Sequence, residues 1–266
     1  MNRRPARAKP LAWLLPLLVL ALGTPAPGAE DEALEALEAL KEKMAWEARQ
    51  LKRLSAMVRI PEGEFFMGAE NTHPNESPVH RVFVSAFDLD QYEVTQLQYL
   101  SVMGTNPSYF NKCLLCPVEK VDFHRAEEYC RKVGKRLPTE AEWEKAARGG
   151  RLGPYYWGND LIDPYAWYGN NAGGQTRPVG TREPNPLGLH DMAGNVWEWV
   201  ADWYAPDYYE RSPYRDPRGP EKGATRVIRG GGWGNPPELL THSYRDHRDP
   251  DTHYINVGFR CARDAS

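Results

Sequence analysis

The stretch from Gly188 to Tyr204, GLHDMAGNVWEWVADWY, constrains the fold more than any other part of the chain. It contains three tryptophans, and each indole ring needs a large buried surface and a partner for its N–H group. In an extended segment, Trp197 and Trp199 share one face and Glu198 lies on the other. The stretch therefore indicates an extended segment on which the rest of the chain is organised.

The carboxylates of this stretch leave two interpretations open. Asp191 and Glu198 could approach one site, with the carbonyl groups of Gly194 and Val196 between them in the sequence. Hard oxygen donors of this kind suit a calcium ion. Alternatively, the segment is a Trp-rich core strand whose acidic face is solvated.

The composition favours a loop-rich fold held by aromatic packing over a helical bundle. The 266 residues are enough for one large domain or two small ones with a sizeable core. Nine Trp and fourteen Tyr are many for this length, and 23 Gly and 23 Pro interrupt regular structure throughout the chain.

Residues 1–29 have the pattern of a signal peptide. Basic residues between Arg3 and Lys9 precede an apolar run from Leu11 to Leu22, and small residues and prolines follow up to Ala29. The run is about twelve residues long, whereas a bilayer span needs about twenty. We therefore expect an exported protein, periplasmic or extracellular, without a stable membrane anchor after cleavage of the signal.

The charge balance argues against two classes of partner. The formal net charge is −3, and removal of the signal takes away four basic residues and no acidic one. A mildly acidic exported protein is a poor candidate for binding nucleic acid or an anionic membrane. The expected partner is a protein, peptide or glycan ligand.

Residues 30–56 predict an amphipathic helix, because Glu30 to Ser55 contains neither Gly nor Pro. Apolar residues occupy heptad positions a and d, interrupted only by Glu47: Leu37, Leu40, Met44, Leu51 and Leu54. The helix could form a short coiled coil that joins copies into a homo-oligomer. The alternative is a stalk or packing on the main domain, which we expect to span 57–266.

Several shorter elements have clear local signals. The alternation of Val82 to Asp90 predicts a strand. Helices are expected after Thr95, running to about Met103, and after Asp122. A third helix is expected where Thr139 and Glu142 form a capping box, with Gly149 as the stop. Short strands are expected at Arg226 to Arg229 and at Asn256 to Arg263.

Eight motifs in a fixed order resemble those of the sulfatase-modifying factor family, the family of the formylglycine-generating enzyme. The resemblance runs from about Val58 to Arg263. The motifs are IPEGEFFMG (Ile60–Gly68), PVHRV (Pro78–Val82), DQYEVT (Asp90–Thr95), GKRLPTEAEWEKAARGG (Gly134–Gly150), YYWGN (Tyr155–Asn159), GLHDMAGNVWEW (Gly188–Trp199), RVIRGGGW (Arg226–Trp233) and NVGFRCA (Asn256–Ala262).

The resemblance implies an α+β fold: one irregular, loop-rich, C-type-lectin-like domain. It also implies one of the family's calcium sites, with side-chain ligands from Asp191 and Glu198 and main-chain ligands from Gly194 and Val196. The family's other calcium site uses a longer segment than the compressed Asn170 to Gly180 stretch found here, so we do not expect that second site.

Four cysteines in an oxidising compartment suggest disulfides, and the residues alone leave three pairings open. The resemblance implies a disulfide between Cys130 and Cys261. Cys113 and Cys116 remain, in the sequence CLLC. Because Pro117 follows at once in a turn-like context, we expect a small structural disulfide there, with metal or redox chemistry as the alternative.

The chain departs from the family pattern where the oxidase members carry two cysteines that bind copper(I). The alignment places Thr241 and Asp246 at those positions, and no cysteine lies between Cys130 and Cys261. Soft thiolates suit copper(I), and neither Thr nor Asp replaces them. The sequence therefore argues against copper and against formylglycine formation by the copper–cysteine mechanism.

A candidate pocket remains in the same region. Its residues either match positions that line the oxidase site or lie close to them in sequence: Trp233, Ser243, Tyr244, Arg245, Asp246, His247, Arg248 and Asn256. Arg245 and Arg248 could clamp an anionic ligand. Iron or zinc is possible at a set whose spacing matches no defined metal motif: His242, His247, His253, Asp246, Asp249 and Asp251. The alternative is a solvated polar loop.

Three functions are consistent with the sequence. The first is an exported binding or accessory module that keeps the fold and uses its cleft to hold a partner. The second is an oxygen-dependent tailoring oxidase with non-cysteine chemistry, because the family resembled includes proteins implicated in siderophore maturation and in sulfoxide synthesis. The third is an accessory factor for an exported redox enzyme, in which the CLLC pair takes part.

Overall fold

The computed structural model describes residues 29–158 and 162–265. The chain divides into two compact units, Met1–Ala48 and Arg49–Ser266. The expected signal peptide, residues 1–29, lies outside the described residues except for Ala29. None of the described helices is both long enough and apolar enough to cross a membrane.

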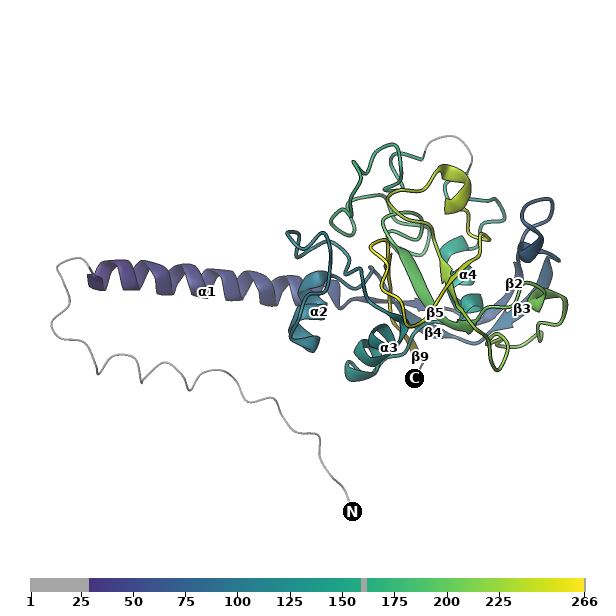
Figure 1. Cartoon of the computed structure of the whole chain (residues 1–266), viewed down its shortest axis with the longest axis horizontal. Helices are drawn as coiled ribbons and strands as arrows, with labels where there is room; N and C mark the ends of the chain where they lie inside the picture. The colour runs from purple at the N-terminus through teal and green to yellow at the C-terminus, as the bar shows by residue number, and fades with distance from the viewer. Residues whose placement is uncertain (1–28, 159–161, 266) are drawn as a thin grey trace, which may run out of the picture. The chain divides into compact units, whose positions relative to one another are not determined.

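The predicted N-terminal helix is confirmed as α1, Ala29–Leu54 (Figure 1). Its portion in the first unit exposes apolar side chains, including Leu34, Leu40 and Met44. The last turn belongs to the second unit, where Leu54 is buried and its carbonyl accepts a hydrogen bond from Gln98 Nε2 at 3.0 Å. The end of the helix is therefore fixed by burial in the domain that follows.

The first four strands of the second unit belong to two small antiparallel sheets. Strands β1 (Met57–Ile60), β4 (Phe87–Asp90) and β9 (Ala262–Asp264) form one sheet in the order β1-β4-β9. Strands β2 (Gly63–Met67) and β3 (His80–Val84) form a separate pair.

The single strand expected at 82–90 is therefore wrong, because the chain changes sheet after Val84. The N–H and hydroxyl groups of Ser85 donate to the carboxylate of Asp216, at 2.7 and 2.8 Å. The Asp216 carboxylate thus provides a hydrogen-bond partner for the Ser85 N–H between the two strands. The strands β3 and β4 can therefore pair in different sheets.

The central sheet has four strands in the order β7-β6-β5-β8. Its strands are β5 (Trp197–Trp203), β6 (Arg226–Arg229), β7 (Asp246–Arg248) and β8 (Val257–Gly258). The strand expected at Arg226 to Arg229 is confirmed, whereas the one expected at 256–263 is split between β8, which runs parallel to β5, and β9.

The three predicted short helices are confirmed as α2 (Gln96–Met103), α3 (Phe123–Lys132) and α4 (Glu140–Arg148). Their N-caps satisfy helix N–H groups that would otherwise have no partner: Thr95 and Thr139 each form a capping box, and Asp122 accepts from Arg125. Three 3-10 turns complete the regular structure of the described residues: Pro74–Glu76, Tyr208–Glu210 and Pro237–Leu240.

Strand β5 lies between two buried clusters. Trp197 and Trp199 both pack in the cluster that contains Tyr99, Phe123 and Phe259, as their shared face predicts. On the opposite face, Val200 belongs to the second cluster and Glu198 contacts its Trp143. Glu198 is completely buried, so the alternative of a solvated acidic face is wrong.

Both expected disulfides are present. Cys130 on α3 is bonded to Cys261, and Cys113 is bonded to Cys116. The first closes a loop with a sequence separation of 131 residues, which corresponds to about 5 kcal/mol of lost unfolded-state entropy. Short strands, three short helices and long irregular connections confirm the α+β, loop-rich fold.

Candidate functional site

A centre of buried carboxylates lies beside β5. Glu198 accepts hydrogen bonds from Arg260 Nε at 2.8 Å and Nη2 at 2.7 Å, and from Trp143 Nε1 at 2.9 Å. All three side chains are fully buried. A buried carboxylate needs such partners because its desolvation is costly, so this ion pair holds α4, β5 and the chain before β9 together.

Asp191 lies in the same centre but has fewer partners. Its Oδ2 atom accepts from the N–H of Gly180 at 2.8 Å, whereas its buried Oδ1 atom has no hydrogen-bond partner among the described residues. Burial raises the pKa of the Asp191 carboxyl. The nearby turn depends on Gly194, which has φ +82° and where a Cβ would collide with the carbonyl of Trp167.

Glu93 is a member of this centre that the sequence did not reveal. Its carboxylate accepts from the Asn195 side chain at 2.6 Å and from the Val196 N–H at 3.1 Å. Burial, and then the charges of Asp191 and Glu198, raise the pKa of Glu93 well above its usual value. Its only signal was its position in the DQYEVT motif, which says nothing about burial.

The oxygen donors of this centre are of the kind that hard cations prefer. Three buried carboxylates, from Glu93, Asp191 and Glu198, face one guanidinium, that of Arg260. Among the carboxylate oxygens of these three residues, only Asp191 Oδ1 lacks a hydrogen-bond partner in the described part of the chain. Arg260 donates to both oxygens of Glu198. Across 29–158 and 162–265, no group of three or more His, Cys, Asp or Glu side chains is arranged to hold a metal ion. The calcium site therefore stays a prediction.

The second candidate region surrounds Trp197. Its indole N–H donates to Asn235 Oδ1 at 2.9 Å, and its main-chain N–H donates to the carbonyl of Asn256 at 2.9 Å. The ring of Tyr244 lies 5.9 Å from that of Trp197. The structure thus brings Tyr244 and Asn256 of the predicted pocket to one tryptophan.

Other residues of the predicted pocket point elsewhere. Arg245 donates to both oxygens of Glu140, at 2.7 and 2.9 Å, and is buried, so the expectation that it clamps a ligand is wrong. The cause is the buried Glu140 carboxylate, which requires a cation. His247 stacks on Tyr204 at 4.1 Å, and Ser243 is buried with its carbonyl bonded to Arg229.

Arg248 is half-buried and its Nη1 atom lies 2.9 Å from Asp246 Oδ1. Asp246 also accepts from the N–H of His247 at 2.7 Å. Thr241 ends the 3-10 turn Pro237–Leu240. The two positions where the family resemblance places copper-binding cysteines are therefore occupied by an ion-paired carboxylate and a turn residue.

All four cysteines of the chain lie within the described residues, and each is in a disulfide. A copper(I) site of the expected kind needs two thiolates. With both disulfides formed, the chain has no thiolate that could bind copper(I).

The histidines suggested for iron or zinc lie in separate surroundings. His242 is buried and stacks on Tyr156 with ring centroids 6.0 Å apart. Burial and the nearby Arg148 lower the pKa of His242 to about 3. His253 pairs with Asp122 at 3.2 Å, and Asp251 pairs with His124 at 3.1 Å.

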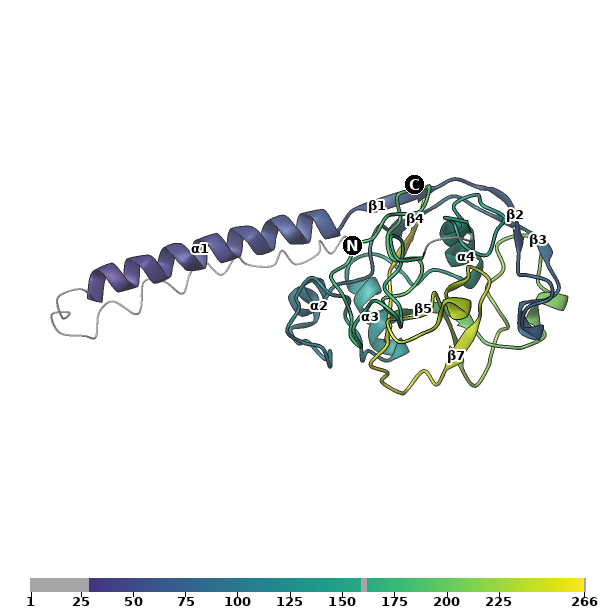
Figure 2. The same cartoon turned by 90° about the horizontal axis from the view of Figure 1, so that it is seen from above.

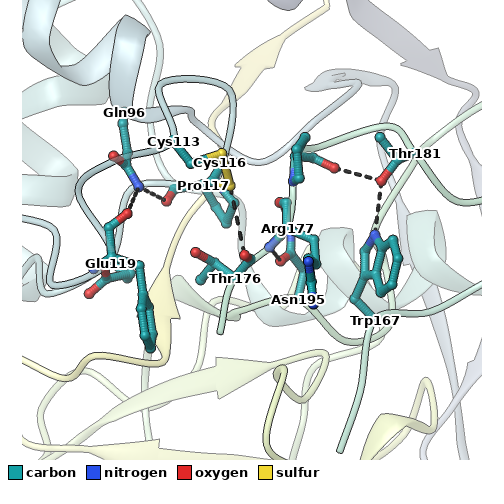
Figure 3. The surroundings of a disulfide bond; sticks show 12 residues. Gln96, Cys113, Cys116, Pro117, Glu119, Trp167, Thr176, Arg177, Thr181 and Asn195 are labelled. Carbon is teal, nitrogen blue, oxygen red and sulfur yellow. Dashed lines mark hydrogen bonds between the residues drawn. A yellow bond between two sulfur atoms is a disulfide. The ribbon is translucent and has the colours of Figure 1, made fainter. Parts of the chain in front are cut away.

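A cavity of about 400 Å³ lies beside the CLLC loop, whose disulfide is drawn in Figure 3. Tyr109, Phe110, both cysteines of the loop and Thr176 help to line it, and Cys116 Sγ lies 3.7 Å from the Thr176 carbonyl. The buried hydroxyl of Thr176 has no partner among the described residues.

Aromatic rings extend from this cavity to Trp233. Phe110 lies edge-on to Trp233 at 5.4 Å, and the ring of Tyr109, which is 63% exposed, lies 5.0 Å from that of Phe110. We call Tyr109, Phe110 and Trp233 the aromatic platform. Sequence reasoning found Trp233 but missed the other two, because they lie more than a hundred residues away in the chain.

Known proteins with similar sequences include members of two groups. The chain is 34% identical to the formylglycine-generating enzyme of Streptomyces coelicolor, over 78% of this chain and 89% of that protein. It is 36% identical to the serine/threonine-protein kinase pkn1 of Chlamydia pneumoniae, over 79% of this chain. The match spans only 38% of that kinase.

Among solved structures, Treponema denticola variable protein 1 is similar with a TM-score of 0.74 and 30% sequence identity, over 79% of this chain and 95% of that one. This likeness agrees with the C-type-lectin-like fold expected for a formylglycine-generating-enzyme-type domain. The model of the sulfatase-modifying factor enzyme 1-like domain matches residues 42–265. The chain therefore belongs to the family of sulfatase-modifying factor enzyme 1-like domains.

Proposed function

We propose that this chain is an exported binding or accessory module that holds a ligand at the aromatic platform. The observation that carries the proposal is the oxidised state of every cysteine, together with Thr241 and Asp246 at the positions where the resemblance expects copper-binding thiols. Without thiolates the copper–cysteine oxidation has no metal site. A family domain without this chemistry retains its cleft and its surface.

The expected ligand is a peptide or glycan. Exposed aromatic rings bury large apolar areas at little cost in side-chain entropy, and they stack on sugar rings or peptide side chains. The cavity of about 400 Å³ beside the platform adds backbone and hydroxyl groups that can fix the orientation of a ligand. The names of the relatives support a family domain with varied uses, since they include a formylglycine-generating enzyme and a protein kinase of whose length the match covers 38%.

Export and calcium binding are parts of the same proposal. Two disulfides in one chain suit an oxidising compartment. A calcium ion beside Asp191 would take its free Oδ1 atom and main-chain carbonyls such as those of Gly194 and Val196. Such an ion would neutralise the excess of buried carboxylates and make this turn more rigid.

The test is a binding screen of the purified chain against glycan and peptide arrays. We expect a ligand whose affinity falls at least about tenfold for Trp233→Ala and Tyr109→Ala, because each removes a stacking surface. Val133→Ala is the control, since Val133 is exposed and lies outside the platform. Binding that these two variants leave intact would contradict the proposal.

An oxygen-dependent tailoring oxidase is the alternative. Metal analysis of the exported protein and oxygen uptake with candidate peptides distinguish the two functions. Stoichiometric iron or copper together with turnover would replace the binding proposal by the enzymatic one.

A further inference from the structure

The hairpin of β2 and β3 has one covered edge and one open edge. On β3, the N–H of Phe83 donates to the Tyr214 carbonyl at 2.7 Å, and the Phe83 carbonyl accepts from the N–H of Asp216 at 2.8 Å. The main-chain groups of Phe83 therefore point away from β2. Figures 1 and 2 both show the hairpin at the margin of the second unit.

The register of the hairpin then fixes the direction of the β2 backbone. Glu64 is the partner of Phe83 in the antiparallel register, so this is a non-hydrogen-bonded pair, and the N–H and C=O groups of Glu64 point outward. Two residues later, Phe66 repeats this orientation. No hydrogen bond to these four groups is found from any described residue outside the hairpin.

A cavity of about 530 Å³ opens along this edge. Phe65 and Phe66 lie on opposite faces of β2, yet both line the cavity, which places the cavity at the edge of the strand and not over one face. Ile60, Leu152 and Leu187 provide further apolar walls. Phe66 is 57% exposed, a large apolar surface for a strand edge.

The rim of this cavity carries one positive charge without an acidic partner among the described residues, that of Arg151. Arg148 is already paired with Glu144 at 2.7 Å, and Lys145 donates to three carbonyl groups. Arg151 is exposed and has no acidic partner among residues 29–158 and 162–265. Arg81 is exposed and lies 3.6 Å from Glu64.

We propose that this groove, lined by β2, Leu152 and Leu187, binds an extended segment of a partner protein that adds to β2 as a new strand. The segment alternates apolar side chains, which enter the cavity, with carboxylates that face Arg151. A second copy of this chain fits less well, because the described residues of its β2 edge would bring a second unpaired Arg151 and no unpaired carboxylate for the first one. This site is separate from the aromatic platform and does not depend on it.

The mode of recognition is strand addition, in which main-chain hydrogen bonds provide affinity and alternate side-chain pockets provide specificity. The open N–H and C=O groups of Glu64 and Phe66 supply up to four such bonds. The apolar walls supply the pockets.

The probes for the test are octapeptides selected from a random linear library on the purified full chain, then synthesised with a fluorescent label. Fluorescence anisotropy gives the affinity. N-methylation of alternate amides on the bonded edge of the peptide is expected to weaken binding at least about tenfold, because it removes main-chain hydrogen bonds. The same number of N-methyl groups on the other edge is expected to leave the affinity within about twofold.

Two protein variants test the charge. Arg151→Glu is expected to weaken an acidic peptide about fivefold, and Arg131→Glu, the same change on the exposed surface of α3, is expected to have no effect. Thermal unfolding shows whether both variants remain folded. Trp233→Ala is expected to bind the octapeptides normally, which separates this proposal from the platform.

Three results would overturn the proposal. The first is a selection that yields no peptide sensitive to Arg151→Glu. The second is equal weakening by both sets of N-methyl groups. The third is displacement of the peptide by oleate that itself binds more tightly, which would assign the groove to an anionic amphiphile.

Discussion

The buried centre beside β5 and the surface around Trp233 differ in what their residues are required to do. In the buried centre, Glu198 needs Arg260, and Glu93 needs the N–H groups around Asn195, because desolvated charges cannot remain without partners. Around Trp233, the side chains are partly exposed and pack ring against ring, as Phe110 and Trp233 do at 5.4 Å. The scaffold is thus fixed by burial, while the surface residues can change without loss of the fold.

The two disulfides provide the largest test of this difference. Replacing Cys130 and Cys261 by Ala is expected to lower the free energy of unfolding by about 5 kcal/mol, since the disulfide closes a loop with a separation of 131 residues. Replacing Cys113 and Cys116, which are three residues apart, is expected to cost about 1.5 kcal/mol. Urea denaturation measures both values, and equal losses would remove the distinction between scaffold and surface loop.

The Glu198–Arg260 pair is expected to give the next largest effect on stability. Arg260→Met leaves a buried carboxylate without its cation and is expected to destabilise the protein by about 3–5 kcal/mol. The matched control is Arg263→Met, because Arg263 pairs with Asp88 but is largely exposed. That variant should lose less than about 1 kcal/mol. A loss of similar size in the two variants would argue that the buried pair does not organise the centre.

Calcium should alter the pH dependence of stability. Burial raises the pKa values of Glu93 and Asp191, so the folded state holds protons that the unfolded state releases. In EDTA, stability is therefore expected to fall as the pH rises above the ordinary values of 4.5 and 3.8 towards the raised values.

Calcium binds the ionised carboxylates, so it should oppose this fall and stabilise the protein by about 2.7 kcal/mol at a hundred times its dissociation constant. Thermal unfolding at several pH values tests this, and Asp191→Asn should abolish the calcium effect. A transition temperature that calcium leaves unchanged at every pH would speak against the site.

His242 should have the opposite dependence on pH. Burial lowers its pKa to about 3, so between this value and the ordinary 6.5 only the unfolded state binds the proton. The stability due to neutral His242 is complete above pH 6.5 and is expected to fall by about 2 kcal/mol between pH 7 and pH 5.

His242→Phe should remove this loss, while His124→Phe, at an exposed position, should keep it. Denaturation at the two pH values gives the comparison. An unchanged acid sensitivity in His242→Phe would show that another group causes it.

The sequence predicted those features of the fold whose cause lies within a few residues. The starts of α2, α3 and α4 follow from caps within four residues, and the faces of β5 follow from alternation. The break after Val84 depends on Asp216, and the orientation of Arg245 depends on Glu140. These partners are more than a hundred residues away, so local propensity and motif spacing could not predict these contacts.

The same dependence on local sequence applies to the buried centre beside β5 and to the surface around Trp233. Family motifs located Cys261, Asp191 and Glu198, because the motifs contain those residues, and the resemblance placed Cys130 in the helix before one of the motifs. They did not locate Tyr109 and Phe110, which complete the platform from a loop outside any motif.

The most direct measurement is mass spectrometry of an exported sulfatase co-expressed with this chain. The surface around Trp233 offers no thiol pair, so the cysteine of the sulfatase motif should remain unconverted at the level of a control without the chain. Conversion to formylglycine above that background would contradict the central claim, because it would show that this surface has kept the chemistry of the oxidases.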